Sequence, residues 1–368
     1  MRIAYLITRM DDLGGAQVHV RDLALAMKNM GHQVVVLCGG DGAFTQQLLA
    51  AGVDCQPIPA LQRSLHALRD FQAFLEIRRR LVALRPDLLS LHSSKAGWLG
   101  RLAGAQLGIP TVFTAHGWSF SGGLPRFRAG LYLWFEKLLA PLTRQLICVS
   151  KADRELGLAH GLAPADRICL IHNGVHDVAS DLRARTALHP PRLVMVARFQ
   201  EPKDHAGLFR ALAALNTRDW SLELVGGGPL LEEMCALAAQ LGLEQQLIFS
   251  GECTDVEVRL AKAQIFILLS RREGFPRSIL EAMRAGLPVI ASQVGGIAEA
   301  VDQGASGFLL PANDYGGALQ ASLESLLVSP ELRGRMGVEG RIRYEREFSF
   351  AAMLDKTLEI YRRMLQDL

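Results

Sequence analysis

Residues 264–290 read QIFILLSRREGFPRSILEAMRAGLPVI, and this stretch decides how the second half of the chain folds. Its apolar run, 265–269, is short enough for a strand that is buried on both faces. Pro276 suits the start of a helix because its missing N–H is not needed there, and we expect a helix over Arg277–Ala285. A second apolar strand follows at 289–291. The order strand, turn, helix, strand predicts one unit of a parallel sheet.

Two glutamates mark a candidate ligand site in this unit. Glu273 stands where the strand ends, and Glu281 lies inside the helix. Ligands of open parallel sheets bind at the carboxyl ends of strands, and the amides at a helix start can receive a phosphate. Carboxylates on either side would suit a sugar hydroxyl or a ribose diol. The same pattern also fits an ordinary helix with Glu281 at its surface.

The whole chain has 368 residues, which fits two domains. Hydrophobic residues make up 49%, enough for large cores, and the net charge of +3 gives no general attraction to nucleic acid. The 6 cysteines form no C-x-x-C pair, as expected for reduced thiols in a cytoplasmic protein. The opening MRIAYLITRMDDLGG lacks the apolar core of a signal peptide, and no window is apolar enough to span a membrane.

Apolar runs alternate with helical patterns through both halves, which predicts an α/β fold of two doubly wound parallel sheets. Strands are expected at 2–8, 34–38, 53–58, 88–92, 111–114, 146–149, 168–171, 193–196, 222–225, 247–249, 265–269, 288–291 and 307–310. Further helices are expected at 16–30, 65–84, 96–107, 128–140 and 151–160. We expect a first domain at 1–176, a linker at 177–190, a second domain at 191–348 and a final helix at 349–368. A ligand cleft between two such domains is the default expectation.

Two features of the first half could line a site. Gly14 and Gly15 follow the first strand without a G-x-G-x-x-G fingerprint, so they either admit a close ligand or form a plain turn. His116 ends a strand beside Gly117, which places it for a cleft, although a turn histidine satisfied by the backbone fits as well. His92 ends the preceding strand, where a structural role is the simpler interpretation.

The second half adds two cations and two glycine turns. Arg198 and Lys203 follow a strand, and two cations there suit a diphosphate whose negative charge grows as it leaves. Glycine turns at 226–228 and at Gly251 allow a flat base to approach, or are simply tight turns. No G-x-S-x-G, P-loop or H-E-x-x-H pattern is present. No D-x-D triplet is present either, so we expect no metal and no other cofactor, with the cations in the metal's place.

The wording EGFPRSILEAMRAGLPVIAS, residues 273–292, resembles the signature of the retaining glycosyltransferases of family four, which have the GT-B fold of two Rossmann-like domains facing a cleft. The resemblance covers nearly the whole chain. It implies that Glu273 faces the donor hexose, that His116 contacts the same sugar, and that Glu281 holds the ribose. The diphosphate contacts that it implies are Arg198, Lys203, Gly15, Gly274, Phe275, Pro276, Arg277 and Ser278.

The resemblance also implies the remaining parts of the site. The nucleobase contacts that it implies are Gly227, Gly228, Gly251, Glu252 and Cys253. Gly14, His92 and Asn173, which lies at the family's hinge, are the residues we assign to the acceptor side. The chain departs from the family pattern at Asp204, where glycine is usual, and at Ala298, where proline is usual.

The predicted activity is transfer of a hexose, with retention, from a nucleotide diphosphate sugar to a glycan or lipid-linked acceptor in polysaccharide synthesis. A UDP-sugar is the expected donor. The alternatives are a sugar-nucleotide epimerase of the same architecture and a catalytically silent sugar-nucleotide-binding scaffold. The basic run 78–80 and the aromatic, basic stretch 118–144 predict peripheral contact with the inner face of an anionic membrane, or else they form an ordinary packed helix with a solvated basic side.

Overall fold

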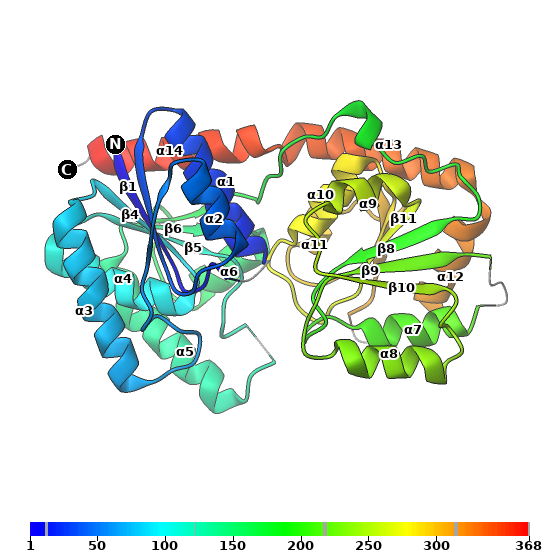
Figure 1. Ribbon diagram of the computed structural model, residues 1–368, viewed down its shortest axis with the longest axis horizontal. Helices are drawn as coiled ribbons and strands as arrows, with labels where there is room; N and C mark the ends of the chain where they lie inside the picture. Colours follow the sequence, from blue (N-terminus) through cyan, green and yellow to red (C-terminus); the bar gives the residue numbers. More distant parts are fainter. Residues whose placement is uncertain (12–13, 122, 216–218, 313–315, 367–368) are drawn as a thin grey trace. The chain divides into compact units, whose positions relative to one another are not determined.

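The computed structural model describes residues 1–11, 14–121, 123–215, 219–312 and 316–366 (Figure 1). The chain forms two compact units. Unit 1 comprises Met1–His172 together with Met353–Leu368, and unit 2 comprises Asn173–Ala352. Each unit is built on its own parallel sheet, which confirms the α/β prediction of two doubly wound domains.

Unit 1 has a 7-stranded sheet in the order β3-β2-β1-β4-β5-β6-β7. Its strands are β1 (Arg2–Ile7), β2 (Gln33–Cys38), β3 (Asp54–Pro57), β4 (Leu88–His92), β5 (Thr111–Ala115), β6 (Gln145–Cys148) and β7 (Ile168–Leu170). Its helices are α1 (Gly15–Asn29), α2 (Ala43–Ala50), α3 (Ala67–Leu84), α4 (Ser94–Leu107), α5 (Arg126–Leu139), η1 (Ala140–Leu142) and α6 (Lys151–Ala159). The strand order reverses between β1 and β4, so the loops after these strands diverge and leave room at the sheet's carboxyl edge.

Unit 2 has a 6-stranded sheet in the order β10-β9-β8-β11-β12-β13. Its strands are β8 (Arg192–Val196), β9 (Ser221–Val225), β10 (Leu247–Gly251), β11 (Ile265–Leu268), β12 (Val289–Ser292) and β13 (Gly307–Leu310). Its helices are η2 (Ser180–Leu182), α7 (His205–Ala213), α8 (Leu231–Gln240), α9 (Val256–Lys262), α10 (Arg277–Ala285), α11 (Ile297–Ala300), α12 (Gly316–Val328) and α13 (Pro330–Glu347). The helix α14 (Phe350–Gln366) begins in unit 2, and its residues from Met353 onward belong to unit 1.

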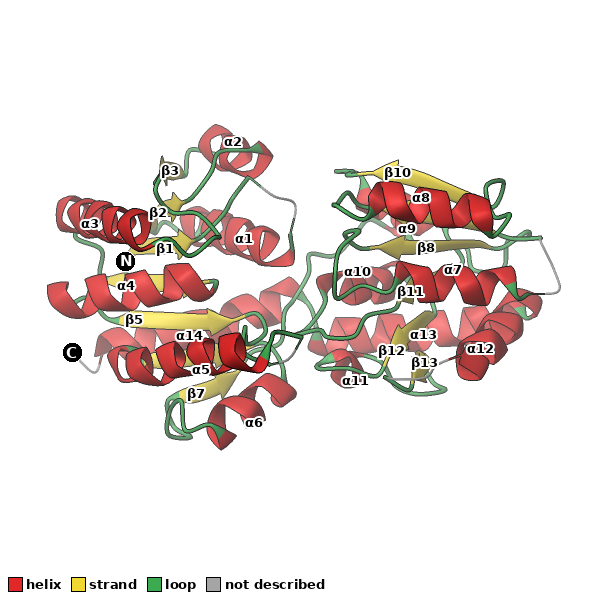
Figure 2. Ribbon diagram, turned by 90° about the horizontal axis from the view of Figure 1, so that it is seen from below, coloured by secondary structure: helices red, strands yellow, loops and turns green. Residues whose placement is uncertain are grey.

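Hydrophobic burial explains why the strands were readable from the sequence. All residues of β4, β5, β11 and β12 are buried, and most of them are apolar, so these strands stand out as largely apolar runs. The helix α4 packs on β1, β4 and β5 and also contacts α3 and α5 (Figure 2). The short helix α2 was not predicted; it is held at its start by the Thr45 hydroxyl, which accepts from the Gly42 amide at 2.9 Å.

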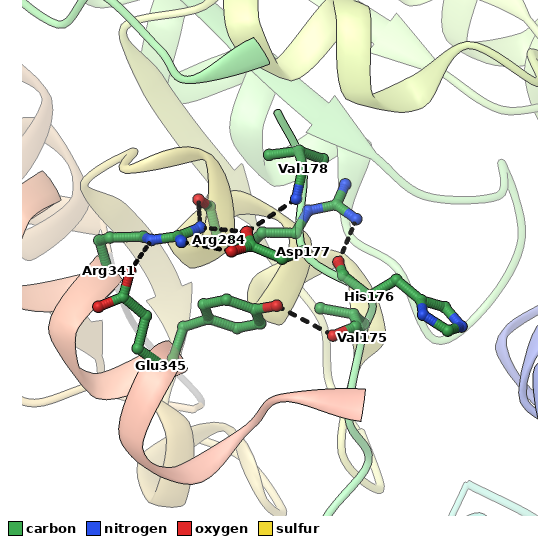
Figure 3. Close-up of polar contacts among 8 residues, drawn as sticks. Val175, His176, Asp177, Val178, Arg284, Arg341 and Glu345 are labelled. Atoms are coloured by element: carbon green, nitrogen blue, oxygen red, sulfur yellow. Dashed lines mark hydrogen bonds and ion pairs between the residues drawn. The ribbon is translucent and has the colours of Figure 1, made fainter. Parts of the chain in front are cut away.

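The segment that follows His172 is fastened within unit 2 (Figure 3). Arg341 of α13 donates from its two terminal nitrogens to the Asp177 carboxylate, at 2.5 and 2.7 Å, and lowers the pKa of that carboxyl. Arg284 of α10 donates to the His176 carbonyl at 2.9 Å, and the Tyr344 hydroxyl donates to the Val175 carbonyl at 3.0 Å. The chain therefore changes unit after His172, four positions before the first-domain boundary that we predicted.

Residues 177–190, for which the sequence predicts a linker, lie inside unit 2. The fully buried Arg333 of α13 donates to the carbonyls of Thr186, at 2.6 Å, and Leu188, at 3.2 Å. The amide of Ala184 donates to the carbonyl of Ala285 at 2.7 Å. A polar, proline-bounded segment looks like a linker in sequence, but here α10 and α13 satisfy its backbone.

Candidate active site

An ion pair between Lys203 and Glu273 lies at the carboxyl edge of the sheet in unit 2. The strands that precede these residues, β8 and β11, are neighbours in the sheet. The chain around Lys203 also pairs with the end of β11, because the Asp204 amide donates to the Leu269 carbonyl at 3.0 Å and the Arg271 amide donates to the Pro202 carbonyl at 2.9 Å. The two side chains are only 17% and 12% exposed, so their attraction is weakly screened.

Asp204, where the family usually has glycine, has a structural role. Its carboxylate accepts from the Gly207 amide at 2.9 Å and thereby caps α7. The departure from the family pattern therefore leaves Lys203 in place. The neighbouring His205 is buried against Phe199, with ring centroids 4.2 Å apart, and burial followed by the charge of Lys203 lowers its pKa to about 4. His205 therefore stays neutral beneath the loop at physiological pH.

The turn after Glu273 depends on two later glycines. Gly295 has a φ of +51°, and a Cβ there would lie 1.7 Å from the Glu273 carbonyl oxygen. The Gly296 amide donates to the Gly274 carbonyl at 2.8 Å. A side chain at Gly295 would push the turn away, so this glycine positions Glu273.

The helix α10 begins at Arg277, with Pro276 as its N-cap and no side-chain cap. The first amides of a helix have no partner inside the helix, so those of Arg277 and Ser278 are suited to an anion. The Arg277 guanidinium is already engaged, since it donates to the Gly174 carbonyl at 2.9 Å. Glu281 lies half-buried one turn farther along α10. The predicted anion cradle and both glutamates therefore belong to one unit of the structure.

Asn173, predicted on the acceptor side, supports the same turn from behind. It is buried, and its amide nitrogen donates to the Phe275 carbonyl at 2.7 Å. This contact lies within unit 2. Whether Asn173 also contacts an acceptor stays a prediction.

The glycine turn at 226–228 shapes the loop that carries Arg198. Gly226 and Gly228 have φ values of +149° and +143°, and a Cβ at either would lie 2.2 or 2.5 Å from the carbonyl oxygen of Ala197 or Phe199. These glycines therefore let two chain segments approach on both sides of Arg198. The close approach predicted for a flat base is here made by the protein's own backbone, and base contact stays a prediction.

The second turn predicted for the nucleobase is joined to the first. The Gly226 amide donates to the Gly251 carbonyl at 2.8 Å, and the exposed Glu252 side chain lies close to Gly227. The Cys253 thiol donates to the Ser250 carbonyl at 3.4 Å, and burial raises its pKa. Cys253 is thus protonated at neutral pH and is suited to shape the turn rather than to react.

Three histidines gather at the carboxyl edge of the sheet in unit 1. His92 ends β4, His116 follows β5, and His19 comes from the second turn of α1. The Nδ1 atom of His92 lies 3.1 Å from Nε2 of His116, and one ring nitrogen from each of the three lies within 4.8 Å of the others. Among the described residues this is the group of three side chains with the spacing to hold a metal ion.

The sequence analysis missed His19. A signal was available, because β1, β4 and β5 are consecutive in the sheet, and the residues that follow them must meet at one edge. Gly14 and Gly15, which precede His19, are the N-cap and first residue of α1. Their contact with the donor phosphates or the acceptor stays a prediction.

The predicted membrane-contact stretch is only partly at the surface. Trp118 and Phe120 are buried in the core of unit 1. On α5, Phe127 is 82% and Trp134 56% exposed, and on α3 Leu68 is 71% exposed. No helix in the described part of the chain is both long and apolar enough to cross a membrane.

Comparison with known proteins decides the family. A model of "Glycosyltransferase Family 4" matches residues 13–178, and a model of "Glycosyl transferases group 1" matches residues 181–343. A D-inositol 3-phosphate glycosyltransferase of Saccharomonospora viridis is 30% identical over 95% of this chain and 89% of its own length. The chain therefore belongs to glycosyltransferase family 4.

Other relatives and solved structures agree with this membership. The glycosyltransferase is 27% identical, over 95% of its length and 94% of the relative's, to an Escherichia coli UDP-Gal:alpha-D-GlcNAc-diphosphoundecaprenol alpha-1,3-galactosyltransferase. The crystal structure of Anabaena Alr3699/HepE in complex with UDP and glucose covers 99% of this chain and is itself fully covered, with a TM-score of 0.85 and 21% identity. The glycosyltransferase therefore has the predicted GT-B type of fold. The two relatives from S. viridis and E. coli are named as transferases, and nothing in these comparisons favours the epimerase alternative.

Proposed function

We propose that this glycosyltransferase moves a hexose from a UDP-sugar to a glycan or lipid-linked acceptor in polysaccharide synthesis, with retention of the anomeric configuration. The observation that carries the proposal is the Lys203–Glu273 ion pair beside the amino end of α10. It puts a cation, a carboxylate and helix amides at one sheet edge, which is a suitable set for a diphosphate joined to a sugar. The E. coli relative that uses UDP-Gal on a diphosphoundecaprenol acceptor, and the neighbour solved with UDP and glucose, support this choice of substrates.

In the proposed complex each group has one task. The amides that begin α10 hold the diphosphate, and Glu281 accepts hydrogen bonds from the ribose. Arg198 and Lys203 stabilise the negative charge that grows on the leaving nucleotide. Glu273 binds the hexose, and its pairing with Lys203 orients the carboxylate before the donor arrives.

For the chemical step we propose front-face attack by the acceptor hydroxyl. The glycosidic C–O bond to the diphosphate breaks, the acceptor oxygen bonds to the same carbon, and the leaving phosphate oxygen takes the acceptor's proton. The protein's share is positioning and charge stabilisation. We further propose that the reaction needs no metal, because Arg198 and Lys203 supply the positive charge that a metal ion would otherwise bring.

We also propose that the enzyme works in the cytoplasm at the inner membrane face. The exposed Phe127 and Trp134 on α5 are accompanied by the exposed Arg128 and Lys137. Exposed aromatic and basic side chains on one helix suit the boundary of an anionic bilayer. An acceptor anchored in that bilayer would then be within reach of a protein bound at its surface.

Calorimetry with UDP, GDP and ADP, followed by a transfer assay with the matching labelled sugars, tests the proposal. We expect UDP to bind most tightly and the sugar to appear on an extracted lipid or glycan acceptor as the α-anomer, as proton coupling constants in the product would show. Release of free sugar without an acceptor would favour the epimerase. Binding without any turnover would favour the silent scaffold, and tighter binding of GDP or ADP would refute the choice of donor.

A further inference from the structure

A chain of buried hydrogen bonds leads from the final helix of unit 1 to His116. The Tyr361 hydroxyl on α14 donates to Oγ of Ser90 at 2.8 Å. Ser90 Oγ lies 3.0 Å from Nε2 of His92, and Nδ1 of His92 lies 3.1 Å from Nε2 of His116. Tyr361, Ser90 and His92 are all fully or almost fully buried, so water does not compete for these contacts.

The direction of each bond follows from counting hydrogens. In the described part of the chain, Ser90 Oγ contacts the Tyr361 hydroxyl, from which it accepts, and Nε2 of His92, so His92 is the one partner to which the serine hydrogen can be donated. Because Nε2 of His92 accepts this hydrogen, the imidazole carries its own single hydrogen on Nδ1. That hydrogen is donated to Nε2 of His116, which leaves the ring hydrogen of a neutral His116 on Nδ1.

The backbone at the end of β4, directly after His92, is also held in place. Ser93, directly after His92, has a φ of +71°, a conformation that residues other than glycine rarely adopt. Thr8 holds it there, since its amide donates to Ser93 Oγ at 3.1 Å and the two hydroxyls lie 2.7 Å apart. Backbone strain of this kind persists where the surroundings enforce it, and it is common at functional sites.

We propose that Tyr361, Ser90 and His92 are positioning residues that set the tautomer of His116, so that His116 presents an Nδ1 hydrogen to a substrate oxygen. The proposal rests on the function proposed above and on the sugar contact that the family resemblance implies for His116. An imidazole without such partners would populate both tautomers, and in one of them a substrate oxygen would meet a lone pair instead of a donor.

A metal ion at the three histidines is the competing use of the same side chains. An ion held jointly by His92 and His116 would need the lone pair of His92 Nδ1, the atom that faces His116. The hydrogen-bond chain instead places a hydrogen on that nitrogen. The two uses exclude each other, so one experiment can separate them.

Long-range proton–nitrogen correlation spectra of protein labelled with ¹⁵N-histidine distinguish the two tautomers directly. In the wild type we expect His116 and His92 as neutral Nδ1–H tautomers. Tyr361→Phe and Ser90→Ala each remove a hydroxyl from this chain of hydrogen bonds, and we expect a mixture of tautomers at His116 in both variants. Tyr344→Phe removes another buried tyrosine hydroxyl, in unit 2, and should leave the His116 signals unchanged.

The kinetic consequence should appear in turnover. We expect kcat of Tyr361→Phe and Ser90→Ala to fall by about tenfold or more, with the affinity for UDP unchanged. An Nε2–H tautomer at His116 in the wild type would refute the proposal even if both variants fail to fold. So would unaltered tautomers in two folded variants, or tight uptake of one zinc ion per chain on titration. Full activity of His116→Ala would instead refute the role of His116 in the proposed function, whatever the spectra show.

Discussion

Lys203 and Glu273, separated by 70 positions in the sequence, form an ion pair because the segment 202–204 pairs with residues 269–271, directly after β11. The backbone thus places Lys203, which we predict to bind the diphosphate, against Glu273, which we predict to bind the sugar. The pair is mostly buried, so removing either partner would leave the other charge poorly compensated. Each residue therefore affects the other's role, and tests of the site must separate them.

Loss of either cationic side chain that is proposed to bind the donor, Arg198 or Lys203, should reduce transfer. Arg198→Ala and Lys203→Ala each remove a charge-assisted contact to the leaving diphosphate, which we expect to cost about 2–4 kcal/mol in the transition state, measured as the fall in kcat/KM. Arg271→Ala is the matched control, because Arg271 lies two positions before Glu273 in the same loop but has a side chain that is 62% exposed. Near-normal turnover in both test variants would show that neither cation acts on the donor.

The two glutamates should have separable effects. Glu281→Gln removes the proposed ribose contact, so it should weaken binding of free UDP by about 1–3 kcal/mol. Glu273→Gln should leave the affinity for UDP nearly intact and lower kcat, because we assign Glu273 to the hexose, which UDP lacks. Calorimetry with UDP and steady-state kinetics measure both quantities. The reverse pattern would exchange the two assignments.

Transfer should continue without a metal ion. Since Arg198 and Lys203 are proposed to supply the positive charge at the diphosphate, excess chelator should leave the transfer rate unchanged. The assay uses the purified enzyme with and without chelator, and then with added magnesium or manganese. Activity that disappears with chelator and returns with either metal would contradict this expectation.

Anionic vesicles should bind the protein through α5. We expect sedimentation with vesicles that contain phosphatidylglycerol at low salt, and weaker binding at high salt because screening shortens the reach of basic residues. Replacing Phe127 and Trp134 by serine should weaken binding by about 1.5–3 kcal/mol for each side chain that the bilayer buries fully. Ile248→Ser, at an exposed apolar position in unit 2, is the control. A protein that ignores such vesicles at low salt would make a soluble acceptor the better hypothesis.

Acid should destabilise unit 2 through His205. Its pKa is lowered to about 4 in the folded protein, against 6.5 ordinarily, so between these values the unfolded chain binds more protons. The free energy of unfolding should therefore fall as pH drops through this window, by up to about 1.4 kcal/mol per pH unit from this one group. Denaturant titrations of His205→Gln should show a shallower fall than the wild type. An equal slope in both, with the exposed His189→Gln as control, would remove His205 from the explanation.

The sequence by itself determined the class of fold and the family. Buried strands read as largely apolar runs in the sequence, and the bounds of β4, β13 and α10 were predicted to the residue. The phrase around Glu273 and Glu281 is local, since turn, helix start and carboxylates lie within one strand–helix unit. Local patterns of this kind survive in a linear sequence, so the resemblance to glycosyltransferases could be recognised there.

Only the tertiary structure decided which distant residues meet. The ion pair of Lys203 with Glu273, the glycine at 295 beneath the Glu273 turn, and the link from Tyr361 to His116 each join segments that no local pattern connects. The apparent linker at 177–190 became part of unit 2 because buried arginines of α10 and α13 satisfy the backbone around it. Hydrogen-bond partners and the close approach of backbones depend on strand order and register, and these arise only when the sheets assemble.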